Sequence, residues 1–155
     1  MILVLDFGSQ YTQLIARRIR ESKVYCEIHP FNAALEKIEG LKPEGIVLSG
    51  GPASVYQENA PKIKAEVFKL PVPFLGICYG MGMINLFSGG DVARAEQREY
   101  GPAELIVDND ADLFRGFSKN ELVRVWMSHG DKMTSMPKGW HALAHSGNSP
   151  IAAFA

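Results

Sequence analysis

The sequence has few of the features that direct a protein to a membrane, a nucleic acid or an oxidising compartment. Its 155 residues include only two cysteines, Cys26 and Cys78, so at most one disulfide could form. Sixteen basic residues stand against 17 acidic ones, and a net charge of −1 creates no positive field for nucleic acid or anionic lipid. No apolar run is long enough to span a bilayer, and the N-terminus lacks the order of regions of a signal peptide. We therefore expect a soluble, cytoplasmic protein.

The composition and length are those of one ordinary folded domain. Hydrophobic residues make up 46% of the chain and charged residues 21%, which excludes intrinsic disorder. Apolar runs typical of buried strands at 2–5, 24–28, 45–48 and 73–77 alternate with helical patterns around 11–19, 33–38, 60–68 and 81–87. In the first helix, the predicted apolar face is Tyr11, Leu14, Ile15 and Ile19. This alternation predicts an α/β fold: a doubly wound, mostly parallel sheet with helices on both faces.

The pattern changes after Gly90. Residues 104–107, 123–127 and 140–145 alternate as strands joined by turns, and residues 151–155 resemble the start of another strand. We expect a small antiparallel supplement to the parallel sheet.

The segment Gly76-Ile77-Cys78-Tyr79-Gly80 stands between a predicted strand and a predicted helix. It has the pattern of a nucleophile elbow with cysteine in place of serine, in which glycines permit a strained, tight turn. The helix N-terminus favours the thiolate of Cys78, and the N–H of Tyr79 is placed to stabilise an oxyanion. The alternative is a buried structural cysteine in a glycine-rich turn.

Three other segments follow predicted strands and are candidates for binding loops: residues 6–10, 49–54 and 128–132. In the second, Ser49-Gly50-Gly51-Pro52 could supply N–H groups to an oxyanion or a phosphate, or could simply end a strand. The ends of parallel strands share one edge of a sheet. We therefore predict that the 2–5, 45–48 and 73–77 strands lie side by side, with Cys78 at their carboxyl edge close to Gly50 and Gly51.

Histidines were considered as general bases and metal ligands. His129 lies in the predicted loop 128–132 and is the local candidate for a base beside a cysteine, or else a hydrogen-bonded loop residue. His141 and His145 have the spacing of helical metal ligands, but the alternation around them favours a strand. We expect no metal site.

Five stretches together resemble class I glutamine amidotransferases and, within that class, the glutaminase domains of GMP synthetases. They run along essentially the whole chain and read LDFGSQYTQLIARR (5–18), GIVLSGGPASVY (45–56), GICYGM (76–81), REYGPA (98–103) and VWMSHGDK (125–132).

The resemblance implies a set of roles. Cys78 would attack the side-chain amide of glutamine, releasing ammonia and forming a thioester that water hydrolyses. The N–H groups of Gly51 and Tyr79 would form the oxyanion hole. The residues implied to bind substrate are Gly50, Gly51, Ser128, His129, Gly130 and Asp131.

The resemblance also implies a partner. The ammonia would pass to an ATP-pyrophosphatase synthetase domain, which uses ATP and magnesium to convert xanthosine monophosphate to GMP. No glycine-rich loop of such a domain occurs in the sequence, so we expect no cofactor in this chain.

Two departures from the family pattern stand out. The family's histidine base and its glutamate partner lie in a stretch that reads roughly F-H-P-E, which does not occur among these residues. We therefore interpret residues 1–155 as one amidotransferase domain, incomplete at its C-terminus, and expect this chain alone to be a poor glutaminase. Gly82 stands where the family has a glutamine that contacts the substrate.

Two other functions are compatible with the residues themselves. A cysteine hydrolase or peptidase of similar fold would use His129 as its base. A non-catalytic module would bind a small anion through the loops at 6–10 and 49–54.

Overall fold

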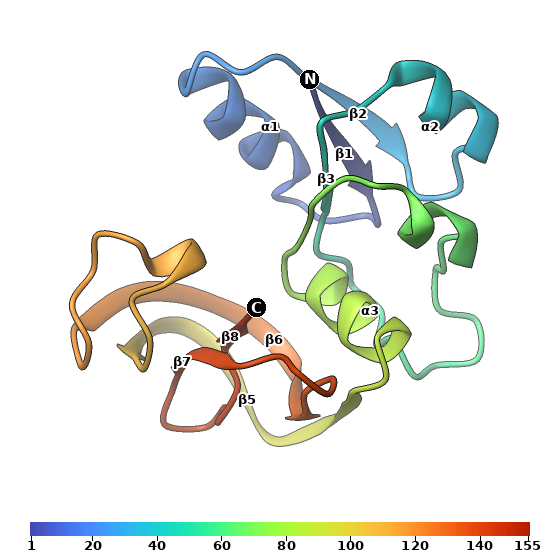
Figure 1. The fold of residues 1–155 in the computed structure, drawn as a ribbon. Coiled ribbons are helices and arrows are strands. Elements are labelled where there is room, and N and C mark those ends of the chain that lie inside the picture. The colour runs from blue at the N-terminus through green and yellow to red at the C-terminus, as the bar shows by residue number, and fades with distance from the viewer. The chain divides into compact units, whose positions relative to one another are not determined.

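The computed structural model describes residues 1–155, apart from the side chains of residues 96–99. The chain forms two compact units, Met1–Ile84 and Asn85–Ala155 (Figure 1). None of the helices that the structure describes has the length and apolar character needed to cross a bilayer.

The first unit is built on a parallel four-stranded sheet in the order β2-β1-β3-β4. Its central strands come from the most apolar runs, and Leu3, Leu5 and Leu48 are fully buried. The strands are β1 (Ile2–Asp6), β2 (Cys26–Pro30), β3 (Gly45–Leu48) and β4 (Phe74–Gly76), and the helices are α1 (Thr12–Glu21), α2 (Leu35–Leu41) and α3 (Tyr79–Phe87), whose last residues belong to the second unit.

The path of the chain through this sheet places helices on both of its faces. The chain passes from β1 outward to β2 and then crosses back over β1 to β3. Parallel crossovers are right-handed, so two crossovers that run in opposite directions put their helices on opposite faces. In Figure 1, α1 and α2 lie on opposite sides of the strands. The predicted doubly wound sheet is confirmed, and so is the neighbourhood of the strands at 2–5, 45–48 and 73–77.

The predicted amphipathic helix is confirmed as α1, but only two of the four positions of its predicted apolar face, Ile15 and Ile19, are half-buried. Thr12 and Ala16 are buried, whereas Tyr11 and Leu14 are 48% and 45% exposed. Thr12 faces inward because its hydroxyl donates to the carboxylate of Asp6 (2.7 Å). The small Ala16 side chain takes the other inward position one turn later, so the largest apolar side chains at the start of this segment face solvent.

The helix predicted at 60–68 is also wrong. The structure has only a short 3-10 helix, Ala65–Lys69, and residues 61–64 are neither helical nor extended in a strand. Pro71 disfavours helical geometry in Leu70, which is extended and ends the 3-10 helix. Ile63 and Val67 are nevertheless buried, so the apolar spacing reflected burial rather than a helix.

The second unit is an antiparallel four-stranded sheet in the order β6-β5-β7-β8. The expected antiparallel supplement is confirmed, with its first two strands longer and its last two shorter than the sequence predicted. Its strands are β5 (Asp91–Val107), β6 (Leu122–Ser135), β7 (Ala142–His145) and β8 (Ala153–Phe154), and a 3-10 helix (Asp112–Phe114) follows β5.

The loop predicted at 128–132 is wrong, because these residues lie within β6. Ser128 pairs with Tyr100, and Asp131 pairs with Arg94, across the long ladder between β5 and β6. The ladder does shift register between Arg94 and Glu99, so this part of the hairpin is irregular. Gly130 and Asp131 looked like turn residues, but the described backbone does not have positive φ at either of them.

Candidate active site

Cys78 occupies the turn between β4 and α3. Its φ angle is +52°, in the left-handed region that a residue with a side chain rarely adopts. Such strain persists only where the surrounding structure imposes it, and it is typical of functional turns. The structure therefore confirms that the segment around Cys78 is a strained strand-to-helix turn.

Glycine is required on both sides of this turn. A Cβ on Gly76 would lie 2.5 Å from the backbone nitrogen of Met81, and a Cβ on Gly80 would lie 2.3 Å from the carbonyl oxygen of Leu48. Both distances are far below van der Waals contact. The N–H of Gly80 also donates to the carbonyl of Ser49 (3.1 Å). The first turn of α3 is thus pressed directly against the end of β3.

The loop after β3 reaches the same place. A Cβ built on Gly50 would lie 3.6 Å from the Cβ of Cys78 and 3.5 Å from the Oγ of Ser9. The loops that follow β1 and β3 therefore meet the cysteine turn at the carboxyl edge of the sheet, as predicted. This is the edge at which open α/β sheets bind their ligands.

Short polar side chains hold the two loops. The carboxylate of Asp6 accepts from the N–H of Gly8 (2.9 Å) as well as from Thr12. The hydroxyl of Ser49, which is fully buried, accepts from the N–H of Phe7 (2.9 Å) and donates to the carbonyl of Gly50 (2.8 Å). These bonds satisfy polar groups of the two loops and order the loop backbone beside Cys78.

The side chain of Tyr79 was not singled out by the sequence. It is only 4% exposed, its ring lies 5.2 Å from the ring of Phe7, and its hydroxyl donates to the carbonyl of Pro61. Burial raises the pKa of Tyr79 to about 12. A single tyrosine in a turn gives no periodic signal, so this contact could be seen only in the folded structure.

The two cysteines occupy different environments. Cys26 lies in β2, is 1% exposed and donates from its Sγ to the carbonyl of Ala16 (3.4 Å). Cys78 is half-buried, and neither cysteine is in a disulfide. Gly82, one turn after Cys78, is buried in α3 and donates its N–H to the carbonyl of Cys78 (3.1 Å).

The predicted substrate-binding residues fall in both units. Gly50 and Gly51 belong to the first unit with Cys78, and residues 128–131 belong to the second. Nδ1 of His129 lies 2.9 Å from the backbone oxygen of Asp131, on the same strand. A role for residues 128–131 in substrate binding stays a prediction, as does a catalytic role for His129.

His145 and His141 pair with nearby acids in the second unit. Nδ1 of His145 lies 2.9 Å from the carboxylate of Asp108, and Nε2 of His141 lies 3.5 Å from that of Asp112. His145 is in a strand, as the alternation predicted. Among the residues that the structure describes, no group of three or more histidine, cysteine or acidic side chains is arranged to hold a metal ion.

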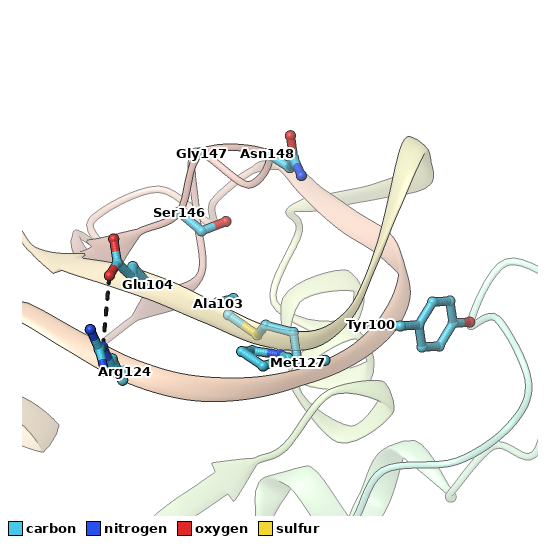
Figure 2. Close-up of a pocket in the computed structure, with 10 residues that line it drawn as sticks. Tyr100, Ala103, Glu104, Arg124, Met127, Ser146, Gly147 and Asn148 are labelled. Carbon is cyan, nitrogen blue, oxygen red and sulfur yellow. Dashed lines mark ion pairs between the residues drawn. The ribbon is translucent and has the colours of Figure 1, made fainter.

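An open pocket of about 640 Å³ lies in the second unit (Figure 2). Glu104 from β5 and Arg124 from β6 form an ion pair at its edge, with 3.9 Å between charged atoms. Because both side chains are largely exposed, this pair adds little stability. The pocket is lined by residues 100–104, Arg124, Met127 and residues 146–148.

Comparisons with known proteins agree on one family. The sequence model of the family described as "Glutamine amidotransferase class-I" matches residues 3–155. The chain is 54% identical over 158 aligned residues to a protein of Wolinella succinogenes named as a glutamine-hydrolyzing GMP synthase, and the match covers 99% of this chain and 30% of that protein. The chain thus spans less than a third of the length of this relative.

Solved structures show the same fold. A crystal structure from Thermoplasma acidophilum, described provisionally as one of the subunits of a GMP synthase, matches with a TM-score of 0.87 and 28% identity, over 99% of this chain and 76% of that one. A glutamine amidotransferase from Thermotoga maritima matches with a TM-score of 0.78 and 24% identity, over 99% of this chain and 70% of that one. At that identity, the second match supports the fold alone.

Proposed function

We propose a function from an established premise: this chain belongs to the class I glutamine amidotransferases. In this proposal the chain hydrolyses glutamine to glutamate and ammonia, with Cys78 as the nucleophile. The observation that carries the proposal is the left-handed backbone of Cys78 in a glycine-flanked turn, beside the loop that contains Gly50. A purely structural cysteine would not need this strain.

The chemistry begins with the thiolate of Cys78, which attacks the carbon of the side-chain amide. A C–S bond forms, and the carbonyl oxygen of the amide becomes an oxyanion. When that intermediate collapses, the C–N bond breaks, and the nitrogen takes up a proton and leaves as ammonia. Water then attacks the thioester, releasing glutamate and restoring the thiol.

The oxyanion is stabilised by the backbone N–H groups of Gly51 and Tyr79. Tyr79 is the first residue of α3, and the N–H groups of a first helical turn have no partner within the helix. Gly51 lies in the loop whose neighbouring residue, Gly50, is next to Cys78. Fixed donors of this kind are typically worth about 10²- to 10³-fold in rate each.

The proton transfers need a base. By the family resemblance this is a histidine with a glutamate partner, in an F-H-P-E stretch that does not occur among these 155 residues. We propose that the chain tested alone turns glutamine over slowly, because general-base assistance contributes about 10²- to 10⁴-fold. Ser128, His129, Gly130 and Asp131 are proposed to hold the amino-acid end of glutamine.

The relatives suggest where the ammonia goes. The Wolinella succinogenes relative is named as a GMP synthase, and this chain matches 30% of its length. We propose that the partner is an ATP-pyrophosphatase synthetase domain that uses ATP and magnesium to convert xanthosine monophosphate to GMP, and that this chain itself needs no cofactor. Neither Cys26 nor Cys78 is in a disulfide, which is consistent with a reducing compartment, and we propose the cytoplasm.

A chloroketone analogue of glutamine tests the proposal. We expect it to modify Cys78 selectively, as read by mass spectrometry, and we expect free glutamine to slow the reaction. Cys78→Ser should abolish labelling, and the matched variant Cys26→Ser should leave it unchanged. Labelling of Cys78 that glutamine does not slow would favour a cysteine hydrolase of another specificity, and labelling of neither cysteine would favour a non-catalytic module.

A further inference from the structure

The hydroxyl of Tyr79 ties the cysteine turn to a distant part of the loop after β3. It donates to the carbonyl of Pro61, 18 residues earlier in the chain. That carbonyl lies in the same β3–β4 connection as Gly51. One buried side chain therefore joins the segments that carry the two proposed oxyanion donors.

Phe7 also contacts both segments that carry the proposed oxyanion donors. Its ring lies 5.2 Å from that of Tyr79, and its carbonyl oxygen would lie 2.7 Å from a Cβ on Gly51. Its own N–H donates to the buried hydroxyl of Ser49. Phe7 is 3% exposed, so the backbone of Gly51 and the ring of Tyr79 are both packed against one buried residue.

The backbone at Tyr79 needs such support. It follows a residue with a φ angle of +52°, and a strained conformation persists only when its surroundings hold it. The Tyr79 N–H makes no hydrogen bond within α3, and its peptide plane is held through the carbonyl of Cys78, which accepts from the N–H of Gly82 (3.1 Å). The side chain adds a restraint from outside the turn, through Pro61 and Phe7.

We propose that Tyr79 is a positioning residue as well as an oxyanion donor. The hydrogen bond from its hydroxyl to Pro61 and its contact with Phe7 orient its own N–H toward the reacting carbonyl. The same contacts keep the N–H of Gly51 in position beside it. This inference rests on the function proposed above. Phenylalanine would fill the same volume without the cost of burying a hydroxyl. The hydroxyl therefore serves to orient the Tyr79 N–H. An oxyanion hole needs this orientation, since small misplacements of catalytic groups reduce rates steeply.

Two reactions at Cys78 separate positioning from general stability. A γ-aryl ester of glutamate acylates the thiol through an oxyanion, and its phenolate leaves without a general acid, so the test needs no downstream histidine. Iodoacetamide alkylates the same thiol without forming an oxyanion. The ratio of the acylation rate to the alkylation rate then reports on the oxyanion hole.

We expect Tyr79→Phe to lower that ratio by about 10-fold, with alkylation changed less than about 2-fold. Phe7→Leu should lower it in the same direction. Tyr25→Phe is the matched control, because Tyr25 is 64% exposed and its hydroxyl bonds only the surface residue Glu27 among the contacts described. It should change neither rate.

The outcomes distinguish the two proposals. An unchanged ratio in Tyr79→Phe, or an equal fall in both rates, would overturn the positioning role while leaving the glutaminase assignment intact. If the unmodified chain reacts with iodoacetamide but is not acylated by the ester, the proposed function itself fails. Thermal unfolding of each variant, recorded under the assay conditions, confirms that the rates come from folded protein.

Discussion

Gly80 packs its α-carbon against the carbonyl of Leu48, so closely that a Cβ on Gly80 would lie 2.3 Å from the carbonyl oxygen. The same oxygen accepts a hydrogen bond from the N–H of Ile77 (3.0 Å). The end of β3 thus contacts both the strand that precedes Cys78 and the helix that follows it. This contact fixes the position of the cysteine turn relative to the end of β3.

Gly80→Ala should therefore be one of the most damaging small substitutions in the chain. The added methyl cannot avoid backbone atoms, and overpacking of this kind costs about 1–3 kcal/mol. We expect the free energy of unfolding, measured with urea, to fall by about that amount, and the alkylation rate of Cys78 to fall with it.

Gly40→Ala is the matched control. Gly40 lies inside α2, and a Cβ there would meet no atom within 4 Å. This substitution should raise the free energy of unfolding by about 0.5–1 kcal/mol, because glycine is a poor helix former. If the two variants were equally stable, the close approach of Gly80 to Leu48 would be wrong.

The two thiols should differ in reactivity. Cys78 is half-buried at the N-terminus of α3, where the helix favours the thiolate, whereas Cys26 is buried in β2 and its Sγ donates to α1. We expect iodoacetamide to modify Cys78 much faster than Cys26 in the folded chain. The enhancement should be modest, because pairing with a histidine is the larger influence in cysteine–histidine enzymes.

Mass spectrometry of the alkylated chain at several pH values makes this measurement. Unfolding in urea serves as the control, since both thiols should then react at similar rates. Equal rates in the folded chain would remove the physical basis for a nucleophilic Cys78.

The alkaline stability of the chain should depend on Tyr79. Burial raises the pKa of its hydroxyl from 10.0 to about 12 in the folded state. Between these values the unfolded chain releases the phenol proton and the folded chain retains it. The contribution of Tyr79 to stability is therefore intact below about pH 10 and is lost as pH rises toward 12.

Urea unfolding at a series of pH values above 9 would measure this loss. Tyr79→Phe should unfold with a shallower dependence on pH in this window than the unmodified chain. Tyr25→Phe should alter the dependence less, because Tyr25 is exposed and solvent screens the hydrogen bond and the charge of Glu27 that raise its pKa. Identical pH profiles for all three chains would show that the Tyr79 phenol is not held in a buried environment.

The sequence predicted the parallel sheet and the cysteine turn because their signals are local. Continuous apolar runs indicate strands buried on both faces, and Gly76 and Gly80 mark a turn that only glycine permits. We then predicted that β1, β3 and β4 are neighbours, because the loops that bind a ligand lie together at the carboxyl edge of an open parallel sheet.

The errors came from features that tertiary contacts decide. Ser128-His129-Gly130-Asp131 has the composition of a turn, but pairing with β5 makes it part of a strand. The inward face of α1 is decided by the bond between Thr12 and Asp6, which apolar periodicity cannot register. Contacts between residues far apart in the chain, such as the Tyr79–Pro61 bond, leave no trace in a single sequence.

Asn85 is another buried residue that the sequence did not reveal. Its side chain is fully buried, and its Nδ2 donates to the carbonyls of Asp91 and Ser135 (both 2.9 Å), at the start of β5 and the end of β6. Asn85→Ala would leave these two part-buried carbonyls without their Asn85 donor. We expect the free energy of unfolding to fall by about 1–3 kcal/mol.

Asn148→Ala is the control for this prediction, because Asn148 is exposed on the rim of the pocket in Figure 2. Its stability should stay within about 0.5 kcal/mol of the unmodified chain in the same urea titration. A similar loss in both variants would show that Asn85 does not join the two strands.

Gly82→Gln tests the departure from the family pattern. Gly82 lies one turn beyond Cys78, and residues four apart on a helix share a face, so a side chain at this position starts from the face that carries the nucleophile. An amide there would add hydrogen bonds to bound glutamine. We expect tighter substrate binding, seen as a lower glutamine concentration for half-maximal protection of Cys78 against iodoacetamide. The limiting alkylation rate without glutamine should stay unchanged.

Gly82→Ala separates this effect from helix stability, because it adds about 1 kcal/mol of helix propensity without an amide. If alanine improved protection as much as glutamine did, the gain would come from a firmer helix, and position 82 would have no direct contact with the substrate.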